Sequence, residues 1–140
     1  MDEILTSNLR KAKLKVTPQR MAIYSYLMNT TSHPSVESIY NDLKPMYKSM
    51  SIATVYKNVA TLRDAHLVTE FNVGEDSHRY DANTSFHTHL VCKNCHNVCD
   101  YFGGVELDKQ IKNLKDNMNF DVKEQEVIFY GICDKCQHKD

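Results

Sequence analysis

Apolar residues recur every three or four positions through the first half of the chain, which is the spacing of amphipathic helices. The spacing predicts a short helix over residues 3–14. A second helix is predicted from Thr17-Pro18, because a capping hydroxyl followed by proline favours a helix start. Ser35 is expected to cap a third, which ends near Pro45. The first helix is predicted to turn Ile4, Leu5, Leu9 and Ala12 inward, and the third to bury Val36, Ile39, Tyr40 and Leu43. In the second, Met21, Ile23, Tyr24, Leu27 and Met28 follow at near-helical spacing.

The stretch SIATVYKNVATLRDAHL, which begins at Ser51, repeats the helical pattern. Its apolar face is predicted to hold Ile52, Val55, Val59 and Leu62, with His66 as a further candidate, and its other face Thr54, Tyr56, Lys57 and Arg63. Residues 67–73 and 77–81 then alternate as two strands around a turn at 74–76. The three helices from Thr17 onward, followed by a β-hairpin, have the order of a winged helix-turn-helix, whose last helix enters the DNA major groove.

Thr54, Tyr56 and Lys57 stand near the start of this last helix, where side chains can reach base edges and phosphates. The alternative is that they form only the solvated face of a surface helix. The pattern alone leaves both interpretations open.

After residue 82 the pattern changes to short strands at HTHLVC and NVCDYF, a helix over 105–118 and a long strand over 120–133. The whole chain is therefore predicted to be α+β, with an N-terminal winged helix and a small second α/β domain. The boundary is placed around residues 81–85.

Composition adds an asymmetry of charge. Residues 1–72 carry nine Lys/Arg and six Asp/Glu, whereas residues 73–140 carry eight and twelve, together with all five cysteines. We expect a basic half that meets an anionic partner and an acidic half rich in metal ligands. The sequence shows no run of about 18 apolar residues and no secretory signal, so we expect no membrane span and a cytoplasmic location.

In that compartment cysteines indicate metal or redox chemistry rather than disulfides. Cys92 and Cys95, and again Cys133 and Cys136, have the C-x-x-C spacing that places two thiolates on one tetrahedral ion. We therefore predict a structural Zn²⁺ on all four. The segment 92–96 also matches the C-x-x-C-H haem signature, but this leaves the second pair unexplained. Cys99 is predicted to be a buried small residue on a strand, with a resolving or alternative ligand role as the minority interpretation.

His87 and His89 are two residues apart on a predicted strand, so both imidazoles can face one ion. Because the sulfur site takes the nearby cysteines, the pair needs other partners. The candidates are Asp81, Asp100 and His33, with His78 and His96 as lesser ones. Imidazoles and carboxylates suit a first-row ion such as Fe²⁺ or Mn²⁺.

Six stretches of the chain together resemble the ferric uptake regulator (Fur) superfamily of bacterial metalloregulators. They are KVTPQR (15–20), HPSVESIY (33–40), MSIATVYKNVATL (50–62), RYD (79–81), HTHLVCKNC (87–95) and YGICDKC (130–136). The resemblance implies a homodimer that binds double-stranded operator DNA through a winged-helix domain at 1–81. It also implies a hinge at 82–85 and a dimerisation and zinc-binding domain at 86–140.

The resemblance further implies that the four cysteines hold structural zinc and that one regulatory ion is bound by His33, Asp81, His87, His89 and Asp100. This ion would set the angle between the domains and thus the spacing of the two recognition helices. Tyr56 would contact bases, and Lys15, Arg20, Thr54 and Lys57 phosphates or bases.

Asp100 stands where iron-sensing relatives usually carry glutamate, and this resembles the peroxide-repressor (PerR) branch. In that branch peroxide reacts with Fe²⁺ at the site and a ligand histidine, here His33 or His87, is oxidised. An iron-responsive repressor is the first alternative. Lys57 departs from the branch pattern, in which a smaller polar residue is expected.

A metal-dependent hydrolase or peroxidase is the alternative from another class. It is disfavoured because no candidate general base stands beside the site and only four glycines are present to shape substrate loops. We therefore expect no enzyme activity.

Overall fold

The computed structural model describes residues 2–74, 77–83, 88–102, 106–123 and 125–138. The chain divides into two compact units, Met1–Thr84 and Ser85–Asp140. No helix within the described ranges is long and apolar enough to cross a membrane. Part of the predicted hinge at 82–85 lies outside the described residues, so the predicted domain limits stay a prediction.

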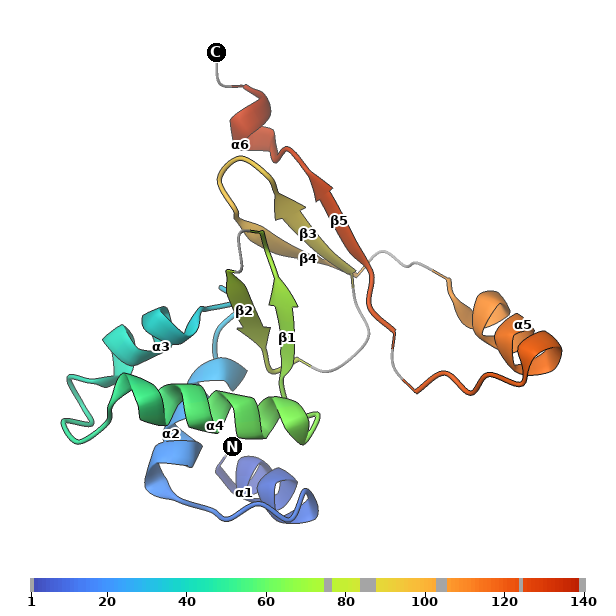
Figure 1. Cartoon of the computed structure of the whole chain (residues 1–140). Helices are drawn as coiled ribbons and strands as arrows, with labels where there is room; N and C mark the ends of the chain where they lie inside the picture. The colour runs from blue at the N-terminus through green and yellow to red at the C-terminus, as the bar shows by residue number, and fades with distance from the viewer. Residues whose placement is uncertain (1, 75–76, 84–87, 103–105, 124, 139–140) are drawn as a thin grey trace. The chain divides into compact units, whose positions relative to one another are not determined.

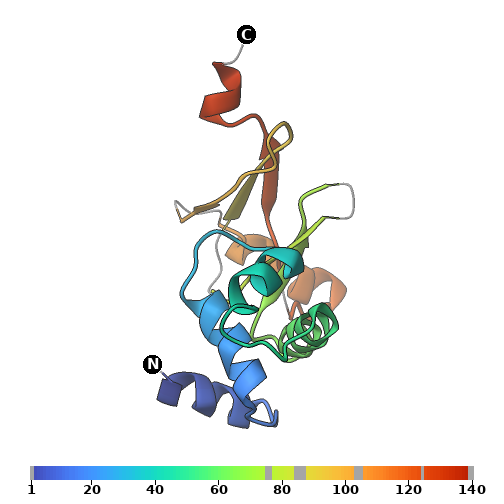
Figure 2. The same ribbon diagram turned by 90° about the vertical axis from the view of Figure 1, so that its left-hand side faces the viewer.

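The described residues of the first unit form four helices: α1 (Asp2–Lys11), α2 (Pro18–Met28), α3 (Val36–Leu43) and α4 (Ile52–Asp64). The hydroxyls of Thr17, Ser35 and Ser51 each accept a backbone N–H three residues ahead and cap α2, α3 and α4. Such caps satisfy N–H groups that the helix itself leaves unpaired. Helix α2 contacts α1, α3 and α4, as both views show (Figures 1 and 2).

These helices enclose one apolar core. Leu5, Leu9, Ile23, Ile39 and Leu62 are all fully buried. The core also includes Tyr80 and Ala82 from the end of the unit. The packing of the helices therefore follows from the periodic apolar positions, most of which meet at one centre.

Strands β1 (Thr69–Asn72) and β2 (His78–Asp81) form an antiparallel hairpin, the wing, which follows the end of α4 (Figure 1). Glu70 lies opposite Tyr80 in the register. The predicted winged-helix order of elements is present, and the α+β class is confirmed.

The second unit holds a three-stranded sheet in the order β4-β3-β5. Strand β3 (Thr88–Cys92) pairs antiparallel with β4 (Val98–Tyr101) and parallel with β5 (Ile128–Gly131). Helix α5 (Asp108–Met118) lies between β4 and β5 in the chain, and a short α6 (Asp134–Gln137) follows β5.

Several predicted details of the first unit are wrong. Helix α1 ends at Lys11, because Lys13 adopts a left-handed backbone with φ 62°. Ile4 is 61% exposed, since Leu5 and Leu9 define the inward face of α1. Ile52 is exposed in the first turn of α4, and His66 is exposed where a left-handed residue follows the helix.

The second unit departs further from prediction. Strand β5 covers only Ile128–Gly131, because β3 offers it a partner for just four residues. Helix α6 was not predicted. Cys99 lies exposed on β4, so the prediction of a buried residue is wrong.

Candidate metal centres and nucleic-acid interface

Four sulfur atoms converge at one end of the sheet in the second unit. Cys92 ends β3, Cys95 lies in the turn after it, Cys133 directly precedes α6 and Cys136 lies within α6. The four Sγ atoms all lie within 4.8 Å of one another. The Lys93 N–H also donates to the Gly131 carbonyl at 2.8 Å, which joins the two C-x-x-C segments. We call this group the four-cysteine cluster.

The electrostatics of the four-cysteine cluster fit a cation. Backbone N–H groups, first that of Cys133 and then that of Cys95, donate to Cys92 Sγ and lower the pKa of this thiol to about 6. The Asn97 N–H lowers the pKa of Cys95, yet contacts with the neighbouring thiols, led by Cys92, and desolvation raise it to about 11. Four crowded thiols resist joint ionisation unless a cation binds them, and Zn²⁺ fits four sulfur ligands.

His33 and Asp81 form a histidine–aspartate pair inside the first unit. His33 Nε2 lies 3.3 Å from Asp81 Oδ2, and both side chains are buried. His33 has a left-handed backbone with φ 53°, its ring meets Phe71 edge-on, and Arg79 Nη1 donates to its carbonyl at 3.0 Å. The loop before α3 is thus held in one conformation against β2.

His89 and Asp100 form the corresponding pair in the second unit. They are directly opposite each other on β3 and β4, and His89 Nε2 lies 3.5 Å from Asp100 Oδ1. His89 is buried and Asp100 partly exposed. His87, the fifth predicted ligand, lies outside the described residues.

Buried imidazoles beside carboxylates supply nitrogen and oxygen donors. Iron and manganese accept such donors, whereas the thiolates of the four-cysteine cluster favour zinc. The donor chemistry of both pairs therefore fits the predicted regulatory ion and is separate from the four-cysteine cluster.

Two predicted DNA contacts lie around the start of α2. Lys15 is exposed. Arg20 is half-buried, and its guanidinium donates to the Lys15 carbonyl at 2.8 Å and to Asn58 Oδ1 at 3.1 Å. Arg20 therefore ties α2 to α4, whatever else it contacts.

The other three predicted contacts lie in the first half of α4. Lys57 is exposed, and Tyr56 is 49% exposed. The Thr54 hydroxyl lies 2.9 Å from that of the cap residue Ser51. The Tyr56 hydroxyl donates to Glu37 Oε1 at 2.8 Å, which raises the pKa of Tyr56.

Sequence reasoning missed the residues that support these sites. Glu37 orients Tyr56, Arg79 and Phe71 hold the His33 loop, and Glu70 accepts contacts from α4 and β2. Of these, Arg79 could have been found from the sequence, because it begins the RYD stretch that ends in the candidate ligand Asp81.

Comparison with known proteins gives a consistent result. The family model described as the ferric uptake regulator family matches residues 11–130. A peroxide-responsive repressor PerR of Staphylococcus epidermidis is 36% identical over 95% of this chain and 88% of its own length.

Solved structures agree. The Campylobacter jejuni peroxide stress regulator is 32% identical with a TM-score of 0.74, covering 96% of this chain and 97% of its own. PerR from Streptococcus pyogenes is 35% identical with a TM-score of 0.55, covering 97% and 92%. The chain therefore belongs to the ferric uptake regulator family.

Proposed function

We propose that this protein is a metal-dependent transcriptional repressor that senses peroxide. The observation that carries the proposal is that each unit holds a histidine–aspartate pair, His33–Asp81 or His89–Asp100, which offers nitrogen and oxygen ligands apart from the four cysteines. The similarity to peroxide-responsive repressors over nearly the whole chain supports peroxide as the signal that the protein senses.

The two pairs come from different units of the chain. One Fe²⁺ or Mn²⁺ bound by both, together with His87, would join the units and fix their relative orientation. Zn²⁺ on the four-cysteine cluster would instead be structural, because closed four-thiolate sites lack an open position for chemistry.

Double-stranded operator DNA is the partner of the first unit. Helix α4 presents Tyr56 and Lys57 on its exposed face, as expected for a helix that enters the major groove. Thr54 near its start, and Lys15 and Arg20 around the start of α2, would add base or phosphate contacts.

A homodimer would present two copies of α4 at the spacing of two half-sites. The second unit exposes large apolar side chains: Leu90, Tyr101, Phe102, Met118, Phe120, Phe129, Tyr130 and Ile132. Exposed apolar side chains in such number favour an interface with a second copy.

Bound Fe²⁺ would supply the reducing chemistry that activates peroxide. His33 and His87 are the ligands we expect to be oxidised. Loss of one ligand frees the units, and DNA affinity falls because only a fraction of molecules then holds the binding-competent orientation.

The test is a mobility shift of promoter DNA by protein loaded with Zn²⁺ and then with Fe²⁺ or Mn²⁺, before and after a low dose of hydrogen peroxide. We expect the Fe²⁺-loaded protein to release DNA and to gain one oxygen on the peptide that contains His33 or His87. The Mn²⁺-loaded protein should do neither.

Other outcomes contradict the proposal. DNA binding that requires Fe²⁺ but ignores peroxide would indicate an iron-responsive repressor. Multiple turnovers of peroxide without self-modification would indicate a peroxidase, because a sensor modifies itself only once per site.

A further inference from the structure

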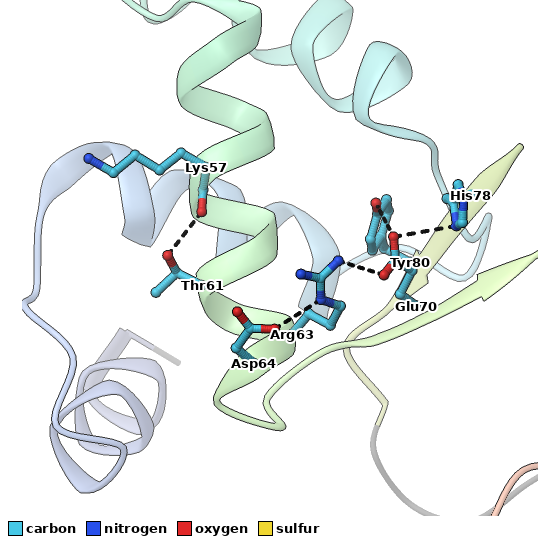
Figure 3. Close-up of polar contacts among 7 residues, drawn as sticks. All are labelled: Lys57, Thr61, Arg63, Asp64, Glu70, His78 and Tyr80. Carbon is cyan, nitrogen blue, oxygen red and sulfur yellow. Dashed lines mark hydrogen bonds and ion pairs between the residues drawn. The ribbon is translucent and has the colours of Figure 1, made fainter. Parts of the chain in front are cut away.

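The first unit holds a set of polar contacts centred on Glu70, which is neither an expected metal ligand nor an expected DNA contact. Glu70 on β1 accepts hydrogen bonds from Arg63 of α4 and Tyr80 of β2, and His78 of β2 lies beside it (Figure 3). We call these four residues the Glu70 junction.

The distances show that both carboxylate oxygens of Glu70 are used. Arg63 Nη1 donates to Oε2 at 2.7 Å, while Tyr80 Oη donates to Oε1 at 2.8 Å and His78 Nδ1 lies 3.4 Å from Oε1. The Glu70 side chain is only 21% exposed, so solvent screens these contacts less than it would on an open surface.

Strand β2 is also the strand that holds the His33–Asp81 pair. Asp81 directly follows Tyr80, whose backbone N–H donates to the Pro34 carbonyl at 3.1 Å, and Arg79 donates to the His33 carbonyl at 3.0 Å. The expected ligands of the first unit are therefore fixed to the same four-residue strand that the Glu70 junction connects to α4.

We propose that Glu70 is a positioning residue that couples metal binding to DNA binding, by fastening the end of α4 to the strand that carries Asp81. This inference rests on the proposed function. If β2 and α4 form one rigid piece, then an ion that orients β2 also orients the DNA-contacting face of α4. Without the fastening, the ion orients β2 while α4 keeps its freedom.

The measured quantity is the metal coupling ratio: the dissociation constant for a promoter fragment without Mn²⁺, divided by that with saturating Mn²⁺. Glu70→Gln keeps the shape but replaces one oxygen by an N–H₂ donor, so it can no longer accept from both Arg63 and Tyr80. Tyr80→Phe removes one hydroxyl without changing charge or packing volume.

We expect the coupling ratio to fall about three- to tenfold in each variant, which corresponds to the loss of one hydrogen bond. Mn²⁺ affinity in the absence of DNA, measured by calorimetry, should stay within about twofold of wild type. A purely structural role would lower the unfolding temperature and leave the coupling ratio unchanged.

Asp64→Asn is the matched control. Asp64 Oδ1 accepts from Arg63 Nε at 3.1 Å, but its side chain is 73% exposed and this contact does not reach the wing (Figure 3). It removes the same charge beside the same arginine, so its coupling ratio should stay within about twofold of wild type.

The outcomes separate the two proposals. A wild-type coupling ratio of one means that metal does not control DNA binding, and the proposed function fails together with this inference. A wild-type ratio well above one that is unchanged in both variants overturns only the role of Glu70. If Glu70→Gln does not fold, Tyr80→Phe decides.

Discussion

Arg20 serves the fold at a position where sequence similarity suggests a DNA contact. Its guanidinium joins the carbonyl of Lys15 to the side chain of Asn58, and Asn58 in turn donates to the Thr54 carbonyl on α4. The planar guanidinium can make both contacts at once, which a smaller or uncharged side chain cannot. Weaker DNA binding by an Arg20 variant would therefore have two possible causes.

Unfolding measurements separate these causes. Arg20→Gln should lower the free energy of unfolding by about 1–2 kcal/mol, because Asn58 is left with an unsatisfied buried acceptor. Lys15→Gln, at an exposed position, should change it by less than about 0.5 kcal/mol. Urea denaturation followed by circular dichroism measures both. Equal stability of the two variants would show that Arg20 does not hold α2 to α4.

Asp100 is the residue on which the expectation of peroxide sensing depends. Asp100→Glu moves the carboxylate one methylene further from β4, so we expect it to fill a coordination position that peroxide otherwise reaches. The variant should keep Mn²⁺-dependent DNA binding and lose most of the Fe²⁺-dependent response to peroxide. Mobility shifts measure both properties, and an unchanged response would remove Asp100 as the determinant.

At the scale of elements, local signals determined what could be predicted. The caps of α2 and α3 were predicted because a hydroxyl and its N–H partner lie three residues apart, and Ser51 caps α4 in the same way. The length of β5 depended on β3, some forty residues earlier, and no local pattern reveals it. The Glu70 junction likewise depends on the register of β1 with β2 and on the left-handed turn at His66.

The same scale separates the two candidate sets of metal ligands. The paired C-x-x-C spacing sufficed to predict that the four sulfurs meet. The approach of His33 to Asp81 required Arg79 and Phe71, which lie far from His33 in the sequence. Donor type made both residues candidates, and the resemblance then placed them in one ligand set.

The free energy of unfolding should depend on pH through the contacts of Glu70 in the wing. Desolvation raises the pKa of Glu70, but hydrogen bonds from Tyr80 and Arg63 outweigh it and lower the pKa below its usual 4.5. The stabilisation is thus present above pH 4.5 and is lost as the pH falls through the lowered value. Glu70→Gln should cost about 1 kcal/mol of unfolding free energy at neutral pH. Urea unfolding should show that the difference in stability between wild type and Glu70→Gln shrinks as the pH falls below 4.5. A difference that stays constant with pH would show that the ionised carboxylate of Glu70 does not stabilise the wing.

At the scale of the whole molecule, the two units differ in how they are stabilised. The apolar core of the first unit draws on all four of its helices. In the second unit, the described residues of α5 and α6 include none that is buried. We therefore expect this unit to depend on a bound metal or a partner for stability, because small units with little core need a metal or oligomerisation.

Zinc removal should consequently affect the units unequally. Cys136→Ser, or treatment with a strong chelator, should remove hydrogen-exchange protection from β5 and α6 while α2 and α4 keep theirs. Structural zinc contributes about 10–16 kcal/mol in small zinc-binding peptides, so the loss should be large. Cys99→Ser is the control, since Cys99 lies outside the four-cysteine cluster. Equal loss in both units would contradict their independence.

Cys99 has a practical consequence of its own. It lies exposed on β4, level with Leu90 on β3, which is in turn level with the exposed Phe129 on β5. If a second copy covers this face, the thiol becomes inaccessible in the assembled protein and reactive in the dissociated one. The rate at which a thiol reagent modifies Cys99, followed across a dilution series with zinc bound, would then report how often the two subunits dissociate.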